Sequence, residues 1–380
     1  MNDRIRTVQD FQRLWSDVLR DRPSRRALLK GALLLGLSAP ALGALLEACG
    51  SAPQPPGAGV ASAGPDLEAA RKEGTLVVLH GDIEADMVKF VQAFTAKTGI
   101  QATEQRLLPG AALPKLEAEL RSGGSSEYDV YDTSDVSVME HLRQQGRLQQ
   151  YISKEMHAYE AAYKSRPEGF WTTYMINVAA IMYSTDHVQP GDAPKTYEDL
   201  LAPRWKRQIG FQDSSAGTQY AWWYLLKDKL PADYWDRLAE QQPRIYASST
   251  QMMQDVYRGE LLIGAKVSIF QHYQALHAHQ PINVVIPPTG APANLQVAGI
   301  IGGTKKPNAA KAYIDYLLSE EGQQAWAGIE GNYSVRSGVT VPGVPPLAAV
   351  KLLLPADYSD YVLTANHAQF VKLWNHISGL

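Results

Sequence analysis

Short β-rich runs alternate with amphipathic helical runs along this 380-residue chain, and this alternation limits the possible folds more than any other feature. The run 75–80 contains the continuous apolar sequence LVVL, which is typical of a strand buried on both faces of a sheet. In the following segment, 84–99, apolar residues recur at helical spacing from Met87 to Phe94 and stop at Gly99, as in an amphipathic helix with a glycine end. The pattern predicts a mostly parallel α/β architecture.

The same alternation continues toward the C-terminus. Further strands are expected at 100–108, 128–134, 207–213, 244–249, 261–267 and 282–287, and further helices at 112–124, 135–146, 308–319 and 320–328. The segment 66–380 is longer than the usual extent of one hydrophobic core, so two lobes are expected.

The N-terminal segment has the pattern of an export signal. An uncharged apolar run, 31–46, follows Arg25 and Arg26, and it is short for a bilayer-spanning helix of about 20 residues. The arginine pair resembles the twin-arginine export motif. The four residues that end at Cys49, which is the one cysteine of the chain, resemble the lipobox of bacterial lipoproteins. We therefore expect removal of residues 1–48 and lipid attachment at Cys49, with an uncut signal anchor or a buried free thiol as alternatives.

Composition narrows the class of protein further. Residues 49–65 are rich in Pro, Gly, Ala and Ser, which predicts a flexible tether between the lipid and the folded part. The formal net charge is −3 and there is no basic run, so a nucleic-acid partner is not expected. Without a second cysteine no disulfide can form, and the core must supply the stability. We expect a lipid-anchored protein on the outer side of the cytoplasmic membrane.

Several longer segments resemble a known family. They are EAARKEGTLVVLHG at 68–81, FVQAFTAKTGIQAT at 90–103, the stretch 174–222, and GGTKKPNAAKAYIDYLLSEEGQQAWA at 302–327. The order of these segments resembles the family 1 extracellular solute-binding proteins, the capture subunits of ABC importers, and in particular their ferric-iron and phosphonate-binding branch. The resemblance extends over nearly the whole mature chain.

The resemblance implies a periplasmic-binding-protein type II fold, in which two α/β lobes joined by crossover strands hold a ligand between them. Lobe 1 would comprise 66–172 and 283–325, and lobe 2 would comprise 173–282 and 326–380. The implied function is that of a substrate-binding subunit, which captures a small solute and delivers it to an ABC permease. We expect a monomer without a cofactor and without enzymatic activity.

Ligands in open α/β sheets bind beyond the carboxyl ends of strands, and four such junctions carry polar residues. The ligand-binding candidates are His80, Asp82, Ser134, Asp135, Ser214, Ser215, Gly217, Thr218, Gln271, His272 and Tyr273, together with Asn177 in the crossover segment. Ordinary polar turns and helix caps are the alternative interpretation at each junction.

The junction 213–218 favours an anion, because the unpaired amides at a helix N-terminus attract negative charge. In iron-binding relatives, two adjacent tyrosines and a histidine bind the metal. The resemblance places Tyr273, Gln274 and Ile83 at these positions, which leaves an iron site incomplete; Tyr183 is a possible replacement ligand. We therefore rank an organic solute with an oxyanion, such as a phosphonate or phosphate ester, above ferric iron, and a polyamine or other cation third.

An exported hydrolase on a two-lobed scaffold is the alternative of another class. The sequence has no HExxH, GxSxG, Walker or CxxC motif, and each of these would supply a recognisable catalytic geometry. His272, His277 and His279 do not share one helical face. The run Trp222–Tyr224 is expected to be core and lobe-surface packing, and not a stacking platform for bases.

Overall fold

The computed structural model describes residues 62–107, 109–121, 125–214, 217–356, 358–361 and 363–379. Cys49, Arg25, Arg26 and Ser215 lie outside the described residues, and the predictions made for them remain predictions. Within the described ranges, no helix has both the length and the apolar character needed to cross a bilayer.

Strands of the described part form one continuous mixed sheet, whose main path runs β2-β1-β3-β10-β5-β8-β6-β7. The strands are β1 Leu76–His80, β2 Ala102–Arg106, β3 Val130–Thr133, β4 Leu148–Gln149, β5 Thr172–Ser184, β6 Ile209–Gln212, β7 Arg244–Tyr246, β8 Ile263–Ser268, β9 Ile282–Val285, β10 Ala291–Ile301, β11 Tyr333–Ser334 and β12 Leu352–Leu353. Strand β1 is parallel to β2 and β3, and β6 is parallel to β7 and β8. Strands β5 and β10 are antiparallel to each other and to their neighbours β8 and β3.

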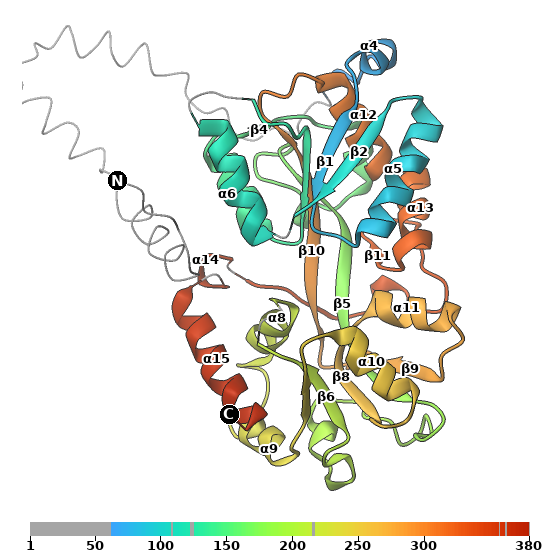
Figure 1. Cartoon of the computed structure of the whole chain (residues 1–380), viewed down its shortest axis with the longest axis vertical. Coiled ribbons are helices and arrows are strands. Elements are labelled where there is room, and N and C mark those ends of the chain that lie inside the picture. The colour runs from blue at the N-terminus through green and yellow to red at the C-terminus, as the bar shows by residue number, and fades with distance from the viewer. Residues whose placement is uncertain are drawn as a thin grey trace, which may run out of the picture. The chain divides into compact units, whose positions relative to one another are not determined.

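The two long strands β5 and β10 connect two α/β lobes (Figure 1). The first half of β5, as far as Val178, pairs with β10, and the second half, from Ala179, pairs with β8 and β9. We call the unit around β1–β3 lobe 1 and the unit around β6–β8 lobe 2. This arrangement is the one that the resemblance implied, whereas the residue limits given above for each lobe remain a proposal.

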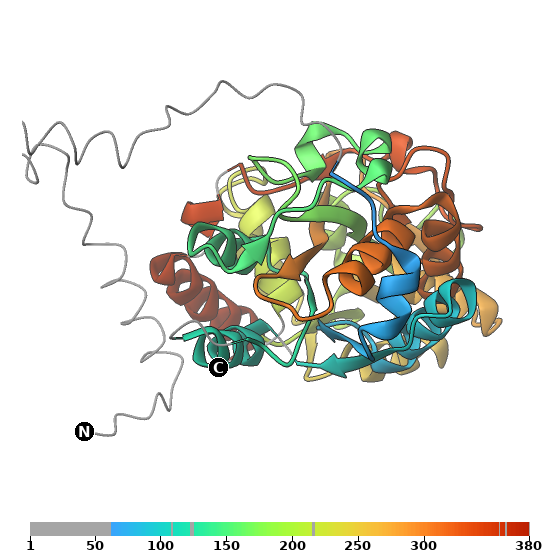
Figure 2. The ribbon, with the colours of Figure 1, turned by 90° about the horizontal axis from the view of Figure 1, so that it is seen from above.

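Helices cover both lobes. The helices of lobe 1 are α4 Leu67–Lys72, α5 Glu84–Thr98, α6 Pro109–Leu120, α7 Val136–Gln144, α12 Pro307–Leu318 and α13 Glu320–Glu330. The helices of lobe 2 are α8 Gly217–Leu226, α9 Tyr234–Glu240, α10 Ser249–Tyr257, α11 Ile269–His277 and α15 Thr364–Ser378. The short helix α14 Tyr358–Tyr361 contacts α7. Short 3₁₀ helices span Lys154–Ala158, Ala161–Tyr163, Glu198–Leu201, Pro203–Trp205 and Leu347–Ala349. Seen from above, α5, α12 and α13 lie together on one side of lobe 1 (Figure 2).

Helix α5 illustrates how local sequence sets these elements. Its apolar residues, among them Phe90 and Phe94, are buried. The centroid of the Phe90 ring lies 4.9 Å from that of the Trp326 ring of α13. The helix ends at Gly99, which takes a φ of 71° and donates its N–H to the Thr95 carbonyl, as glycine does at many helix ends. Both the face and the end of the helix agree with the sequence pattern.

The core of lobe 2 is aromatic. Trp222 and Trp223 of α8 are each 1% exposed, and Trp222 packs against Phe211, Trp235 and Trp374. Both tryptophans are therefore core residues, as predicted, and the half-buried Tyr224 agrees with the predicted packing at the lobe surface. Burial of side chains this large contributes about 2–3 kcal/mol each before the entropy cost of ordering them.

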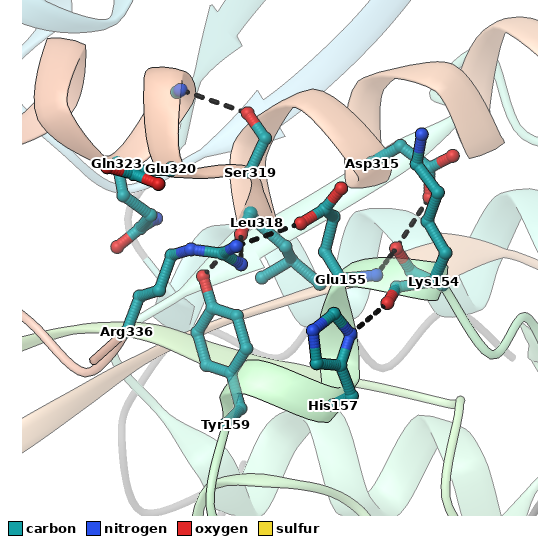
Figure 3. Close-up of polar contacts among 12 residues, drawn as sticks. Lys154, Glu155, His157, Tyr159, Asp315, Leu318, Ser319, Glu320, Gln323 and Arg336 are labelled. Carbon is teal, nitrogen blue, oxygen red and sulfur yellow. Dashed lines mark hydrogen bonds and ion pairs between the residues drawn. The ribbon is translucent and has the colours of Figure 1, made fainter. Parts of the chain in front are cut away.

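After β11 the chain is fixed to lobe 1 by Arg336 (Figure 3). The Arg336 guanidinium donates to the Leu318 carbonyl at 2.8 Å and lies 3.1 Å from the Glu155 carboxylate. The Tyr159 hydroxyl donates to the same carbonyl at 2.9 Å. A cation near the last carbonyls of α12 is favourable, and these contacts hold the chain just after β11 against lobe 1.

Candidate functional site

Polar side chains from three strands, one helix and the turn after β1 meet in lobe 1, and we call them the carboxylate cluster: Asp82, Asp132, Tyr174, Gln296 and Glu330. The Tyr174 hydroxyl on β5 lies 2.5 Å from Asp132 Oδ2 and 3.2 Å from Asp82 Oδ2. Gln296 Nε2 on β10 donates to Asp132 Oδ1 at 3.2 Å and also to Asp82 Oδ1. The two aspartates therefore share the same two donor groups.

The cluster brings three carboxyl groups together where burial favours their protonated forms. Burial raises the pKa of Asp82 to about 7. Burial, followed by repulsion from Asp82, raises the pKa of both Asp132 and Glu330 well above the usual range for carboxyls. Arg106 donates from Nε to the backbone carbonyl of Asp82 at 2.7 Å, rather than to its carboxylate. Each shift has the direction expected when a low-dielectric site holds like charges.

His80, the other candidate at the end of β1, is fully buried and turned toward β2. Its Nε2 lies 2.6 Å from Glu104 Oε2, and burial lowers the pKa of His80 despite this carboxylate. The structure therefore separates His80 from Asp82, because His80 packs against Glu104 whereas Asp82 joins the carboxylate cluster.

At the end of β3, Asp135 is the N-cap of α7. Its Oδ1 accepts hydrogen bonds from the Ser137 and Val138 amides at 3.0 and 3.4 Å and from the Ser137 hydroxyl at 2.5 Å. Ser134 is exposed. The capping interpretation therefore accounts for the contacts of Asp135.

In lobe 2, a buried lysine points at the first turn of α8. Lys266 of β8 is 3% exposed, and its Nζ donates to the Thr218 hydroxyl at 2.5 Å. Burial lowers the pKa of Lys266 to about 7. The next residue of α8, Gln219, is fully buried, and neither polar atom of its side chain has a hydrogen-bond partner among the described residues. We call Thr218, Gln219 and Lys266 the lysine site.

The remaining described candidates of this junction, Ser214 and Gly217, precede Thr218 of the lysine site in the sequence. Ser214 is half-buried and precedes α8, and Gly217 is the first residue of the helix. Because the first amides of a helix have no intrahelical acceptor, the lysine site combines donor groups of the backbone, a hydroxyl, an amide and an ammonium. This set of groups suits an oxyanion.

The candidates on α11 have partners within the protein. Gln271 Oε1 accepts from the Ser268 amide and its Nε2 donates to the Ser249 hydroxyl, both at 2.9 Å. His272 is buried, which lowers its pKa. The Tyr273 hydroxyl donates to the Gly328 carbonyl of α13 at 2.9 Å, so this residue joins lobe 2 to a helix of lobe 1.

The two candidates on β5 lie in different environments. Asn177 is half-buried and directly opposite Asn294 of β10, at the point where β5 passes from lobe 1 to lobe 2. Tyr183 is buried in the hydrophobic core of lobe 2. Within the described ranges, no group of three or more His, Cys, Asp or Glu side chains is arranged to hold a metal ion.

Two surface hollows of about 580 and 450 Å³ lie elsewhere, between α9 and α15. Their linings contain none of the residues of the carboxylate cluster or the lysine site. The chemistry of a candidate site therefore lies with the buried polar groups near the strand ends, and not with these hollows.

Sequence reasoning did not single out Asp132, Gln296, Glu330, Gln219 or Lys266. A signal existed for Lys266, because a lysine within the otherwise apolar run LLIGAKV at 261–267 is unusual in a buried strand. No comparable local signal marks Gln296 or Glu330, since their partners are far away in the sequence.

Residues 126–354 match the family model of the bacterial extracellular solute-binding proteins. The chain is 25% identical over 320 residues to an uncharacterised protein of Haemophilus influenzae, a match that covers 80% of this chain and 91% of that protein. It is 22% identical over 306 residues to the major ferric iron-binding protein of Neisseria meningitidis serogroup B, covering 77% of this chain and 90% of the relative.

Solved structures share the fold. Iron-bound HitA from Pseudomonas aeruginosa has a TM-score of 0.65 at 21% identity, over 81% of this chain and 100% of HitA. The periplasmic binding protein AfuA from Actinobacillus pleuropneumoniae, with fructose-6-phosphate bound, has a TM-score of 0.63 at 20% identity, over 81% of this chain and 99% of AfuA. These neighbours confirm the expected bilobal fold class. Since the family model matches more than half of the chain, the protein belongs to the bacterial extracellular solute-binding protein family.

Proposed function

We propose that this protein captures a small solute that carries an oxyanion, such as a phosphate ester or a phosphonate, and delivers it to the permease of an ABC importer. The observation that carries the proposal is Lys266, an ammonium group buried at the first turn of α8 with the Thr218 hydroxyl as its hydrogen-bond partner. A buried lysine without an opposite charge is costly. An anionic solute would supply that charge when it binds.

The surroundings of Lys266 support an anion in particular. The first turn of α8 offers backbone amides, and the positive end of a helix favours negative charge. The side-chain amide of Gln219 is buried without a partner, and it would gain one from a bound oxygen atom. AfuA, which shares the fold, has a phosphate ester bound.

Ferric iron is the second candidate, because relatives of this chain are ferric iron-binding proteins. Two tyrosines were considered as iron ligands, and their surroundings favour the anion instead. The Tyr273 hydroxyl donates to the Gly328 carbonyl, and Tyr183 lies in the core of lobe 2. Neither would be available as a phenolate without rearrangement of its surroundings.

Isothermal titration of the purified protein with fructose 6-phosphate and with fructose tests this proposal. We expect only the phosphate to bind, and we expect Lys266→Met to weaken it about 100-fold or more, since a charge-assisted hydrogen bond and the neutralised ammonium are both lost. Lys229→Met, which removes an exposed lysine of the same lobe, is the matched control. Unchanged phosphate affinity in Lys266→Met, or a coloured, iron-loaded purified protein, would contradict the proposal.

The proposed organisation of the precursor completes this function. Residues 1–48 would act as a twin-arginine signal peptide, Cys49 would carry the lipid, and the tether to residue 65 would let the lobes reach the permease. The family is extracellular, which supports export.

Cell fractionation tests the lipid anchor: the Cys49→Ala protein should be lost from the membrane fraction. Replacement of Arg25 and Arg26 by lysine should leave precursor in the cytoplasm, and normal export of that double variant would exclude this route.

A further inference from the structure

We propose that the carboxylate cluster of lobe 1 binds a protonated amine of the solute. The solute would then be a zwitterion, with its amine at the cluster and its oxyanion at the lysine site of lobe 2. The anionic end rests on the proposed function, whereas the amine end rests on observations in lobe 1 alone.

The first observation is a shortage of donors. Tyr174 supplies one hydroxyl hydrogen, which lies between Asp132 and Asp82, and Gln296 supplies the hydrogens of one amide nitrogen. These donors serve Asp82 and Asp132, and among the described residues neither of them donates to Glu330. Elsewhere in lobe 1, cations pair with other carboxylates, as Lys306 does with Asp129 at 2.9 Å. Among the described residues, no lysine or arginine forms an ion pair with the cluster.

The second observation is a pair of buried acceptors without donors. Glu330 is 4% exposed and Asn332 is 3% exposed. Glu330 Oε2 and Asn332 Oδ1 have no hydrogen-bond partner among the described residues, although the Asn332 side chain interacts with Glu330 and stabilises its ionised form. Buried polar atoms are nearly always paired, so both atoms call for a donor that the protein itself does not provide.

The chemistry of the missing group follows from these two observations. When Glu330 is ionised, both free atoms are acceptors, so the group that binds there must donate, and a positive charge on that group would stabilise the ionised carboxylates. A protonated amine supplies three N–H donors and one charge. A metal ion is a poorer fit, because no set of three acidic or histidine side chains in the described ranges is arranged to hold one.

The position of the cluster agrees with a solute held between the lobes. Glu330 is the last residue of α13, and two residues earlier the Gly328 carbonyl accepts the hydrogen bond from Tyr273 of lobe 2. The cluster thus lies next to a contact between the lobes. Its negative charge and the positive charge of Lys266 would orient a zwitterion in one direction only, because the reverse orientation places like charges together.

Two probes that differ by one amine test the proposal: 2-aminoethyl phosphate and ethyl phosphate, titrated calorimetrically into the purified protein. We expect the amine to improve affinity about 30-fold or more, as one charge-assisted interaction does. Asp132→Asn and Glu330→Gln should each reduce this advantage to about threefold or less while ethyl phosphate still binds. Lys266→Met should weaken both probes alike.

Asp315→Asn is the matched control, since Asp315, which Figure 3 shows near Glu155, is a half-buried carboxylate of lobe 1 outside the cluster. It accepts hydrogen bonds from Tyr151 and Ser153. Thermal unfolding of each variant verifies that it is folded. Equal affinity for the two probes in the wild type, or an amine advantage that survives both cluster variants, overturns the proposal.

If neither phosphate binds, the proposed function fails, and putrescine then tests the cluster by itself. Putrescine binding that Glu330→Gln abolishes would support the amine site, whereas no putrescine binding would overturn it.

Discussion

The two lobes bury charge in opposite ways. Among the described residues, the lysine that lobe 2 buries is Lys266, which donates to one hydroxyl. In lobe 1, by contrast, Asp82 and Asp132 share two neutral donors, and Glu330 lies close to them. Neither arrangement is a way to stabilise a fold, because buried charges without partners are costly. In a solute-binding protein, such charges at strand ends are expected where a ligand supplies the partner.

A neighbouring carboxylate shows what a structural role looks like. Asp129, three residues before Asp132, is also buried. It accepts from the Val77 amide at 2.8 Å, the Thr304 hydroxyl at 2.6 Å and the Lys306 ammonium at 2.9 Å. Asp129 has an ammonium partner, whereas Asp132 accepts hydrogen bonds from two neutral donors, Tyr174 and Gln296. The difference separates a carboxylate that holds the fold together from one that is available to a ligand.

The largest expected effect is in lobe 2. Lys266→Met should raise the free energy of unfolding at pH 7 by roughly 3–5 kcal/mol, since the folded state holds the lysine pKa about 7 against an ordinary 10.5. Between pH 7 and pH 10.5, Lys266 is protonated in the unfolded chain but not in the folded protein, so the stability of the wild type rises with pH over this range. The stability advantage of Lys266→Met over the wild type therefore disappears near pH 10.5. Urea unfolding at pH 7 and 10 measures this. A destabilised Lys266→Met at pH 7 would contradict the interpretation, and Lys229→Met should change little.

The next effect contrasts two aspartates of lobe 1. Asp129→Asn should destabilise the protein by about 3 kcal/mol, because it removes the ionic partner of the half-buried Lys306 and weakens the hydrogen bonds at this buried position. Asp132→Asn should instead stabilise it near pH 8. The pKa of Asp132 is raised in the folded state, so the folded protein loses stability as pH rises above 4 and Asn removes that loss. Urea unfolding between pH 4 and pH 8 measures both variants. If the two substitutions change the free energy of unfolding equally across this range, Asp129 and Asp132 do not differ in role.

The smallest effect concerns the contact between the lobes. Tyr273→Phe removes the hydrogen bond to the Gly328 carbonyl and should lower the free energy of unfolding by about 1 kcal/mol. Tyr257→Phe, at a half-buried tyrosine of lobe 2, is the control and should have a smaller effect. Thermal unfolding of both variants decides this, and a Tyr273→Phe protein that is as stable as the control would show that the bond contributes nothing measurable.

The sequence by itself predicted much of the local structure. The apolar run at 75–80 is β1, the helical spacing after it is α5, and Gly99 ends that helix as expected. These features could be predicted because each depends on residues within one turn or one strand. The aromatic residues of α8 were likewise recognised as core.

Tertiary structure alone decided which polar groups meet. Gln296 reaches Asp82 across 214 positions of sequence because β10 is inserted beside β3, and the spacing of residues carries no information about that strand order. The α13 helix brings Glu330 into the same cluster only when it packs on α5. The sequence places charged residues at strand ends; the packing of crossover strands and helices determines which of them remain without a partner.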